Sequence, residues 1–290
     1  MAETDEPITH VSDTARWVAS YRAVESARPD ALFNDPLADR LAGERGRAIA
    51  ARGPRLVDNG WNLVTRTRVI DDLIMKSLAE GCDRVINMAA GMDTRPYRLD
   101  LPSEFDWIEA DLPELVGEKS ELLADESPRC SLTRTAVDLA EPEARQQFLD
   151  EALAGAKQAL VLTEGLVYYL AEDDVVSLAA ALARPEIAWW ALDVNNQAIV
   201  KRMSRSNTTL LANAPWRFGP VDPLRFFAGL DWTADEVESL ASAAHKYHRL
   251  PWYMKPLMLL PQPDPRKPIE KPWLPWSSVV RLTHTGTGDQ

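Results

Sequence analysis

The chain of 290 residues is predicted to fold as an α/β protein, with a mostly parallel sheet covered by helices on both faces. Two patterns predict this class. Short runs of strand character alternate with stretches whose apolar residues recur at helical spacing. Parallel strands need such helical crossovers between them. The expected strands lie at residues 84–89, 105–110, 131–137, 158–163, 186–194, around 245–250 and 277–284.

The expected helices follow from apolar spacing and from the residues at their ends. Residues 66–80 place apolar side chains on one stripe. Residues 172–183 open with acidic residues, which favour a helix start, and continue apolar. Residues 13–27 are expected to be helical, with Asp13 as the N-cap. Three large side chains share one face of that helix: Trp17, Tyr21 and Val24. This face either packs into the core or forms part of a lid.

The composition restricts the partners of the protein. The chain has 44 acidic and 32 basic residues, which give a net charge of −12. This charge argues against nucleic acid as the main partner. No apolar run is long enough to span a membrane, and the N-terminal segment MAETDEPITH lacks the apolar stretch of a secretory signal. We therefore expect a cytoplasmic protein with no membrane partner. Cys82 and Cys130 are expected to be free thiols, and His245 and His248 have no nearby ligands that would predict a metal site.

Residues 85–111 form the most informative segment. An apolar run at 85–88 ends in the small-residue turn 89–91, and a second run at 105–108 ends beside Asp111. Strand, small turn, helix, strand and acid is the layout of a nucleoside-binding unit. The small turn allows a ligand to approach the backbone closely, and Asp111 can accept both hydroxyls of a ribose.

The residues of this turn favour one cofactor over another. Of the three glycines typical of a dinucleotide-binding turn, only Gly91 is present, because Ala89 and Thr94 occupy the other two positions. Asp93 would place a negative charge beside a pyrophosphate. S-adenosylmethionine has no phosphate and carries positive groups, so an acidic turn suits it better. A tight turn without any ligand remains the alternative.

Two segments after residue 195 contain many aromatic side chains. Residues 251–276 hold eight prolines, which exclude a regular helix or an inner strand. We expect an ordered loop between the last two strands, held by Trp252, Trp273 and Trp276; a polyproline peptide ligand is the alternative. Residues 213–232 form either an aromatic lid over an apolar small molecule, which we favour, or a helix pair packed on the sheet. The aromatic residues of this second segment are Trp216, Phe218, Phe226, Phe227 and Trp232.

Several blocks between Thr14 and Leu170 follow one another in a characteristic order. They are TARWVASYRAVESARPDALFNDPLADRLAG, NLVTRTRVIDDLI, NMAAGMDTRPYRL, EADLPELVGEK, VDL and TEGLVYYL. Together they resemble the leucine carboxyl methyltransferase-like family, which includes many bacterial S-adenosylmethionine-dependent methyltransferases.

The resemblance implies one domain over residues 1–290 with a class I methyltransferase (Rossmann-like) fold and a seven-stranded sheet. It implies an N-terminal helical lid over residues 1–65 and a cofactor-binding core over 66–195. Residues 196–290 would then supply a substrate-side lid and the C-terminal strands, with a Pro/Trp-rich insertion before the last strand.

The same resemblance implies the residues that bind S-adenosyl-L-methionine at its methionine end. Arg66 matches an arginine that pairs with the methionine carboxylate, which suits the guanidinium fork. Ala89 and Gly91 match the turn against the methionine portion, although Ala89 stands where glycine is usual. Glu164 matches an acid near the same end.

The nucleoside end of the cofactor is implied in the same way. Asp111 matches the acid that binds the ribose. Asp138 and Leu139 match the pair that reads adenine, through a carboxylate and a backbone N–H respectively.

We expect O-methylation of a small-molecule metabolite, at a hydroxyl or carboxylate, because bacterial relatives are associated with secondary metabolism. A carboxylate needs no base, whereas a phenol or alcohol would benefit from one. Tyr21, Tyr168 and Glu164 are the candidates for a catalytic role, and an aromatic wall is the favoured interpretation of Tyr168. The alternatives are methylation of a protein C-terminus, an NAD-dependent oxidoreductase and a non-catalytic nucleoside-binding module.

Overall fold

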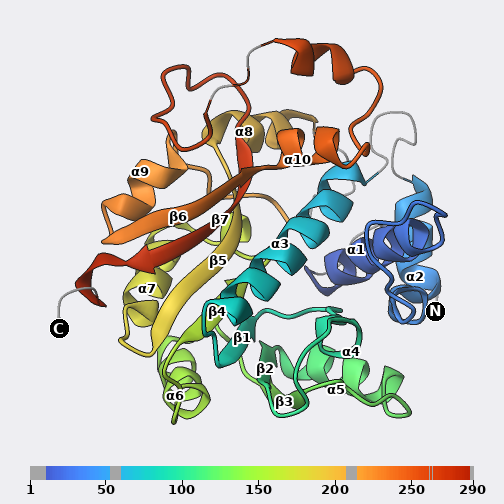
Figure 1. Ribbon diagram of the computed structural model, residues 1–290, viewed down its shortest axis with the longest axis vertical. Helices are drawn as coiled ribbons and strands as arrows, with labels where there is room; N and C mark the ends of the chain where they lie inside the picture. Colours follow the sequence, from blue (N-terminus) through green and yellow to red (C-terminus); the bar gives the residue numbers. More distant parts are fainter. Residues whose placement is uncertain (1–10, 53–59, 207–213, 261, 263, 288–290) are drawn as a thin grey trace.

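The computed structural model describes residues 11–52, 60–206, 214–260, 262 and 264–287. A seven-stranded sheet with the order β3-β2-β1-β4-β5-β7-β6 forms its centre (Figure 1). The strands are β1 (Arg84–Met88), β2 (Asp106–Asp111), β3 (Ser131–Ala136), β4 (Ala159–Thr163), β5 (Ile187–Asn195), β6 (Trp232–Ser239) and β7 (Ser277–His284). The first five are parallel, and β7 runs antiparallel to both β5 and β6. The predicted α/β class is confirmed, and the strand order reverses at β1 and β4, where such sheets bind ligands.

Alternation along the strands builds a core on each face of the sheet. Val85 and Leu160 pack into one core, and their neighbours Ile86 and Val161 pack into the other. The first core lies under α3 (Trp61–Ala79) and α10 (Leu240–Lys246). The second lies under helices on the opposite face, which are α6 (Pro142–Ala152), α7 (Glu172–Leu182) and α9 (Pro223–Ala228). Both helices predicted from apolar spacing in these regions are therefore present, as α3 and α7.

The prediction of a strand around residues 245–250 is wrong. These residues are the end of α10 and the turn that follows it, and the sixth strand is β6. The acidic residues of β6 obscured its strand character. Two of them form ion pairs, Asp235 with Arg281 and Glu236 with Lys76. Ser239 then caps α10, because its hydroxyl accepts a hydrogen bond from the Ser242 N–H.

The N-terminal helices form a separate layer beside the sheet (Figure 1). They are α1 (Val11–Ser26) and α2 (Ala38–Arg52), and α5 (Pro113–Leu122) packs against them through Leu115. Tyr21 is buried and packs with residues of α3, whereas Val24 is exposed. The predicted common face is therefore correct for Tyr21 and wrong for Val24, and Asp13 lies inside the first turn of α1 rather than at its N-cap. Residues 1–10 and 53–59 of the predicted lid lie outside the described residues.

Most aromatic side chains predicted for a lid belong to the core instead. Phe218, Phe227 and Trp232 are buried on one face of the sheet. The Trp190 ring packs edge-on against Phe227 and Trp232, with both centroids 5.3 Å away. The preference for a lid over residues 213–232 was wrong for these side chains, since apolar burial holds them against β5. Residues 207–213 lie outside the described residues.

The Pro/Trp-rich segment is an irregular loop between β6 and β7, as predicted, with a short 3-10 helix at Lys255–Leu259. Trp276 is half-buried against the core, but Trp252 and Trp273 are exposed. Two of the three expected tryptophan anchors therefore do not hold the loop. None of the helices in the described ranges is both long and apolar enough to cross a bilayer.

Replacing Trp190 with alanine tests the packing of this core. Trp190 is fully buried and its Nε1 donates to the Thr163 hydroxyl at 2.8 Å. Trp190→Ala is expected to lower the free energy of unfolding by about 3–5 kcal/mol, because the cavity cannot collapse fully. Urea unfolding followed by circular dichroism measures this. The matched control Trp273→Ala removes an exposed ring and should change stability by less than about 0.5 kcal/mol; equal losses in the two variants would contradict the assignment.

Candidate active site

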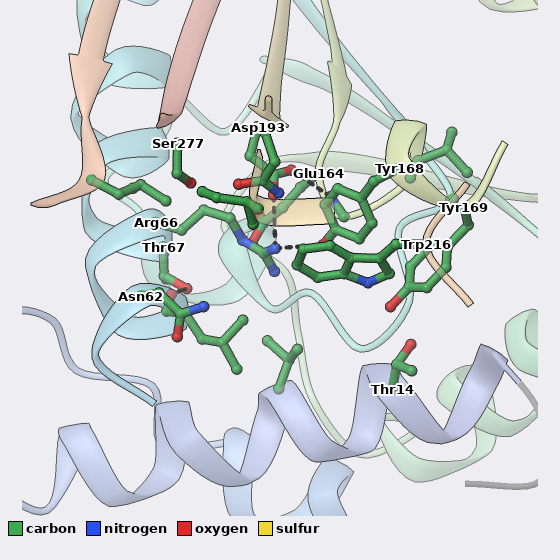
Figure 2. Close-up of a pocket in the computed structure, with 18 of the residues that line it drawn as sticks. Thr14, Asn62, Arg66, Thr67, Glu164, Tyr168, Tyr169, Asp193, Trp216 and Ser277 are labelled. Carbon is green, nitrogen blue, oxygen red and sulfur yellow. Dashed lines mark hydrogen bonds and ion pairs between the residues drawn. The ribbon is translucent and has the colours of Figure 1, made fainter. Parts of the chain in front are cut away.

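A cavity of about 1740 Å³ opens at the carboxyl ends of β1, β4 and β5. Figure 2 shows its charged centre, with Thr14 of α1 on one side and Trp216 on another. Eight residues singled out by the sequence line it, namely Arg66, Ala89, Gly91, Asp111, Asp138, Leu139, Glu164 and Tyr168. The structure therefore brings all the predicted cofactor residues to one cavity.

The turn after β1 has an unusual backbone at two positions. Ala89 has a φ of 58° and Gly91 a φ of 50°. This left-handed region suits glycine and costs an alanine roughly 1 kcal/mol. A β-carbon at Gly91 would also lie 3.0 Å from Ala15 of α1. The turn thus presents its backbone to the cavity and closely approaches the N-terminal helix.

The two acids at the end of β2 have different surroundings. Glu109 is buried and accepts hydrogen bonds from Lys119 at 2.8 Å and Arg134 at 2.9 Å. Asp111 lines the cavity, and its Oδ2 accepts from the Gly91 N–H at 2.7 Å. Burial raises the pKa of Asp111. Glu109 therefore holds neighbouring elements together, whereas Asp111 remains available to a ligand.

Asp93 holds the turn from inside. Its carboxylate accepts from the Asn87 side chain at 2.9 Å, from the Arg95 N–H at 2.9 Å and from Arg95 Nη1 at 2.7 Å. Burial opposes its ionisation, but the charges of Arg95, Lys119, Arg22 and Arg98 together outweigh burial and lower the pKa of Asp93. Asp93 therefore positions the turn. Thr94 precedes the short helix α4 (Arg95–Arg98), but its hydroxyl donates to Asp35 at 2.6 Å and does not cap that helix.

Arg66 is the hub of the charged centre (Figure 2). Its Nε donates to Glu164 at 2.9 Å, and its Nη1 donates to the Tyr168 hydroxyl at 3.0 Å and to Asp193 at 2.9 Å. Glu164 also accepts from Arg95 Nη1 at 2.8 Å. Burial alone would raise the pKa of Glu164, but the charges of Arg95 and Arg66 lower it. Glu164 is therefore ionised at neutral pH and joins the two arginines.

The ion pairs around Arg66 continue to Asp71. Its carboxylate accepts from Arg95 at 2.7 Å and from both Nη atoms of Arg98, at 2.7 and 2.8 Å. Through Asp35, which lies 3.9 Å from Arg98, the cluster also includes Arg22. Four arginines thus face five carboxylates in one connected cluster, which leaves one net negative charge when all are ionised. A cluster of this sign favours a positively charged ligand group such as a sulfonium. Its members are Arg22, Arg66, Arg95, Arg98, Asp35, Asp71, Asp93, Glu164 and Asp193.

The residues predicted to read adenine lie in the loop after β3. Asp138 is exposed, and its Oδ1 accepts from the Ala140 N–H at 3.0 Å. Leu139 is half-buried against the core, and its carbonyl accepts from Arg145 at 2.9 Å. These bonds fix the loop at the edge of the cavity.

Sequence reasoning missed one residue of the site and misplaced another. The missed residue is Asp193 at the end of β5, and its strand-end position was the available signal. Trp216, which the sequence predicted for an aromatic lid, lines the cavity, and the rings of Tyr169 and Trp216 have centroids 4.9 and 4.5 Å from that of Tyr168. Tyr21, a candidate catalytic residue, is not among the cavity-lining residues; its ring packs against Gly60 and α3. Across the described ranges, no group of three or more His, Cys, Asp or Glu is arranged to hold a metal.

The sequence profile of the leucine carboxyl methyltransferase family matches residues 15–183. A protein of Frankia alni, provisionally named an S-adenosyl-L-methionine-dependent methyltransferase, is 33% identical over 255 residues, which cover 81% of this chain and 87% of the relative. A similarly named protein of Streptomyces coelicolor is 31% identical over 268 residues, which cover 86% and 90%. The chain belongs to the leucine carboxyl methyltransferase family and is an S-adenosyl-L-methionine-dependent methyltransferase. The alternative of an NAD-dependent oxidoreductase is set aside.

Solved structures share the fold. A DUF574 family protein of Streptomyces avermitilis aligns with a TM-score of 0.56 at 14% identity, covering 97% of this chain and all of that one. A protein of Thermobifida fusca, provisionally assigned as a methyltransferase, aligns with a TM-score of 0.54 at 14% identity and covers 96% and 97%. The chain thus has the class I methyltransferase fold.

Replacing Glu164 with glutamine tests the charged centre. The variant leaves Arg66 and Arg95 without a shared anion, and breaking ion pairs with two buried arginines is expected to cost about 3 kcal/mol at pH 7. Because folding lowers the pKa of Glu164, its stabilising contribution is complete above the unfolded pKa and is lost as pH falls through the folded value. The difference between the two proteins in urea unfolding should therefore shrink below about pH 4. A difference that stays constant from pH 7 to pH 3 would contradict this role.

Proposed function

We propose that the chain methylates an oxygen of a small, largely apolar molecule, and that a carboxylate or an acidic hydroxyl is the preferred acceptor. When bound, S-adenosyl-L-methionine supplies a methyl group that its sulfonium has already activated. The residues of the chain then need to hold the acceptor in line and keep water out. We propose these acceptors because the described cavity residues include no suitable base that could deprotonate a neutral one.

The predicted cofactor residues fit the methyl donor chemically. Two nitrogens of Arg66 are anchored by neighbouring side chains, and among the described residues its Nη2 forms no hydrogen bond. An anchored guanidinium with a spare N–H group suits the methionine carboxylate. Gly91 and Ala89 offer a close backbone approach, and each oxygen of Asp111 keeps a second lone pair for a ribose hydroxyl. We assign adenine to the loop of residues 138–139.

The acceptor side of the cavity is largely apolar. Beyond the charged centre lie the rings of Tyr168, Tyr169 and Trp216, and apolar side chains from the Pro/Trp-rich loop complete the wall. Such a surface binds an apolar molecule through burial of its area and tolerates few polar groups without partners. A small metabolite with an apolar body fits it better than a polar peptide.

The described residues that line the cavity include no histidine or cysteine, the side chains whose ordinary pKa lies nearest to neutral. Burial, with the charge of Asp193, raises the pKa of Tyr168 well above that of an ordinary phenol, and burial also raises the pKa of Tyr169. Glu164 has a lowered pKa and already holds two arginines. A carboxylate acceptor, with a pKa of about 4, is already deprotonated at neutral pH and needs none of these groups as a general base.

A protein C-terminus is the second candidate acceptor. It also presents a carboxylate, so the same absence of a base among the described cavity residues favours it. Turnover assays with a library of small carboxylates, phenols and C-terminal peptides separate the two candidates.

S-adenosylhomocysteine should stabilise the protein, and NAD should not. At 100 times its dissociation constant, the ligand adds about 2.7 kcal/mol to the folded state. Asp111→Ala is expected to abolish this thermal shift because the ribose loses its acceptor. Asp100→Ala is the matched control, since Asp100 is exposed and does not line the cavity. An unchanged shift in Asp111→Ala would refute the ribose assignment.

Tyr168→Phe should retain most of its activity. Its hydroxyl accepts a hydrogen bond from Arg66 and stays protonated at neutral pH, so its loss should lower kcat by less than about tenfold, whereas loss of a general base costs about 10²–10⁴-fold. With a carboxylate acceptor, the rate of both proteins should be nearly constant from about pH 6 to 8. A hundredfold loss, together with loss of the rise in rate with increasing pH, would identify Tyr168 as the base instead.

A further inference from the structure

The loop between β6 and β7 exposes an unusual number of large apolar side chains. Leu259 is 86% exposed, Trp252 is 78% exposed and Trp273 is 70% exposed. We use the name apolar face for the exposed apolar side chains of this segment, which are Trp252, Leu257, Leu259, Leu260, Trp273 and Leu274. Proteins seldom gather so much apolar surface on one exposed segment unless it meets a partner. Figure 1 shows this orange-to-red segment at the top of the view, away from the sheet.

The segment that carries the apolar face also carries more basic than acidic side chains, although the chain as a whole is acidic. Residues 251–276 carry four basic side chains and only two acidic ones, Asp264 and Glu270, in a chain of net charge −12. The segment therefore has a charge of +2, and the rest of the chain carries −14. The basic residues are Lys255, Arg266, Lys267 and Lys271, and all four are exposed. Arg266 also lies 3.3 Å from a carboxylate oxygen of Glu236.

Helix α8 (Gln197–Ser206) extends the same face. Asn196, just before it, donates from Nδ2 to the Leu274 carbonyl at 2.8 Å and accepts from the Trp276 N–H at 3.1 Å. The sequence of α8 contains no acidic residue, and Lys201 and Arg202 are exposed on it. Two segments that are distant in sequence thus place cations around one apolar surface.

This face also surrounds the opening of the active-site cavity. Leu257, Leu260 and Leu274 of the loop line the cavity, and so do Ile199 and Arg202 of α8. A surface that covers the apolar face would therefore border directly on the acceptor side of the site.

We propose that this face docks onto an anionic membrane surface. Trp252, Leu259 and Trp273 would enter the interface between head groups and acyl chains, where tryptophan is favoured. The surrounding lysines and arginines would lie against the negative head groups. A second copy of the chain fits less well, because a two-fold contact through this face would bring its basic residues opposite one another.

Docking would give an apolar acceptor a route from the bilayer into the cavity. This consequence rests on the proposed function, whereas the docking itself does not. The sequence alone predicted no membrane partner, because that prediction considered only spanning segments. A face that lies on the bilayer needs no such segment.

Vesicle sedimentation with the full chain tests the docking. Vesicles of phosphatidylcholine with one third phosphatidylglycerol should bind the protein at least tenfold more tightly than pure phosphatidylcholine, and high salt should weaken the binding. The triple variant Trp252→Ser, Leu259→Ser, Trp273→Ser should lose at least tenfold in affinity. Val24→Ser, which removes an exposed apolar side chain from α1, is the matched control and should bind normally. Lys255→Gln and Lys271→Gln should each cost about fivefold.

Other results would overturn the proposal. Equal binding of the triple variant and the unsubstituted chain would do so, as would a lack of binding to either vesicle. Self-association that the triple variant abolishes, without vesicle binding, would assign the face to a second copy instead. The thermal shift with S-adenosylhomocysteine should persist in the triple variant, which separates a failure of docking from a failure of the cofactor assignment.

Discussion

The structure of the site depends on one partly buried carboxylate, Glu164, which accepts hydrogen bonds from Arg66 and Arg95 at once. These three residues come from the end of β4, from α3 and from the turn region after β1. The ion pair therefore fixes the elements that border the cavity relative to one another. Two arginines could not be buried so closely without shared anions, which explains why Asp193 and Asp93 complete the cluster.

The same cluster divides the cavity into two chemically different parts. Its connected charges favour the positive sulfonium of the methyl donor, and they leave Glu164 ionised and occupied. On the other side, Tyr168 turns its hydroxyl to Arg66 and its ring to Trp216. One residue thus ends the polar region and begins the apolar wall. The arrangement binds and orients, and it provides the acceptor with no strong base among the described residues.

Local patterns predicted much of the fold, and the residues that they assigned to the cofactor line one cavity. The buried strands read as apolar runs, and the turn at Ala89–Gly91 with Asp111 read as a nucleoside-binding unit. Prediction failed where tertiary contacts overrode local character. The acidic residues of β6 are stabilised by partners such as Arg281, and aromatic residues after position 213 entered the core. Asp193 was missed because its role depends on Arg66, which is 127 positions away in the sequence.

A crystal structure of the protein with S-adenosylhomocysteine tests the central claim most directly. The account predicts that the amino-acid end of the ligand lies beside Gly91 with its carboxylate on Arg66, while Arg66 keeps its bonds to Glu164 and Asp193. It also predicts that the ribose hydroxyls lie on the carboxylate of Asp111. A ligand whose ribose lies away from Asp111, or whose carboxylate leaves Arg66 untouched, would contradict it.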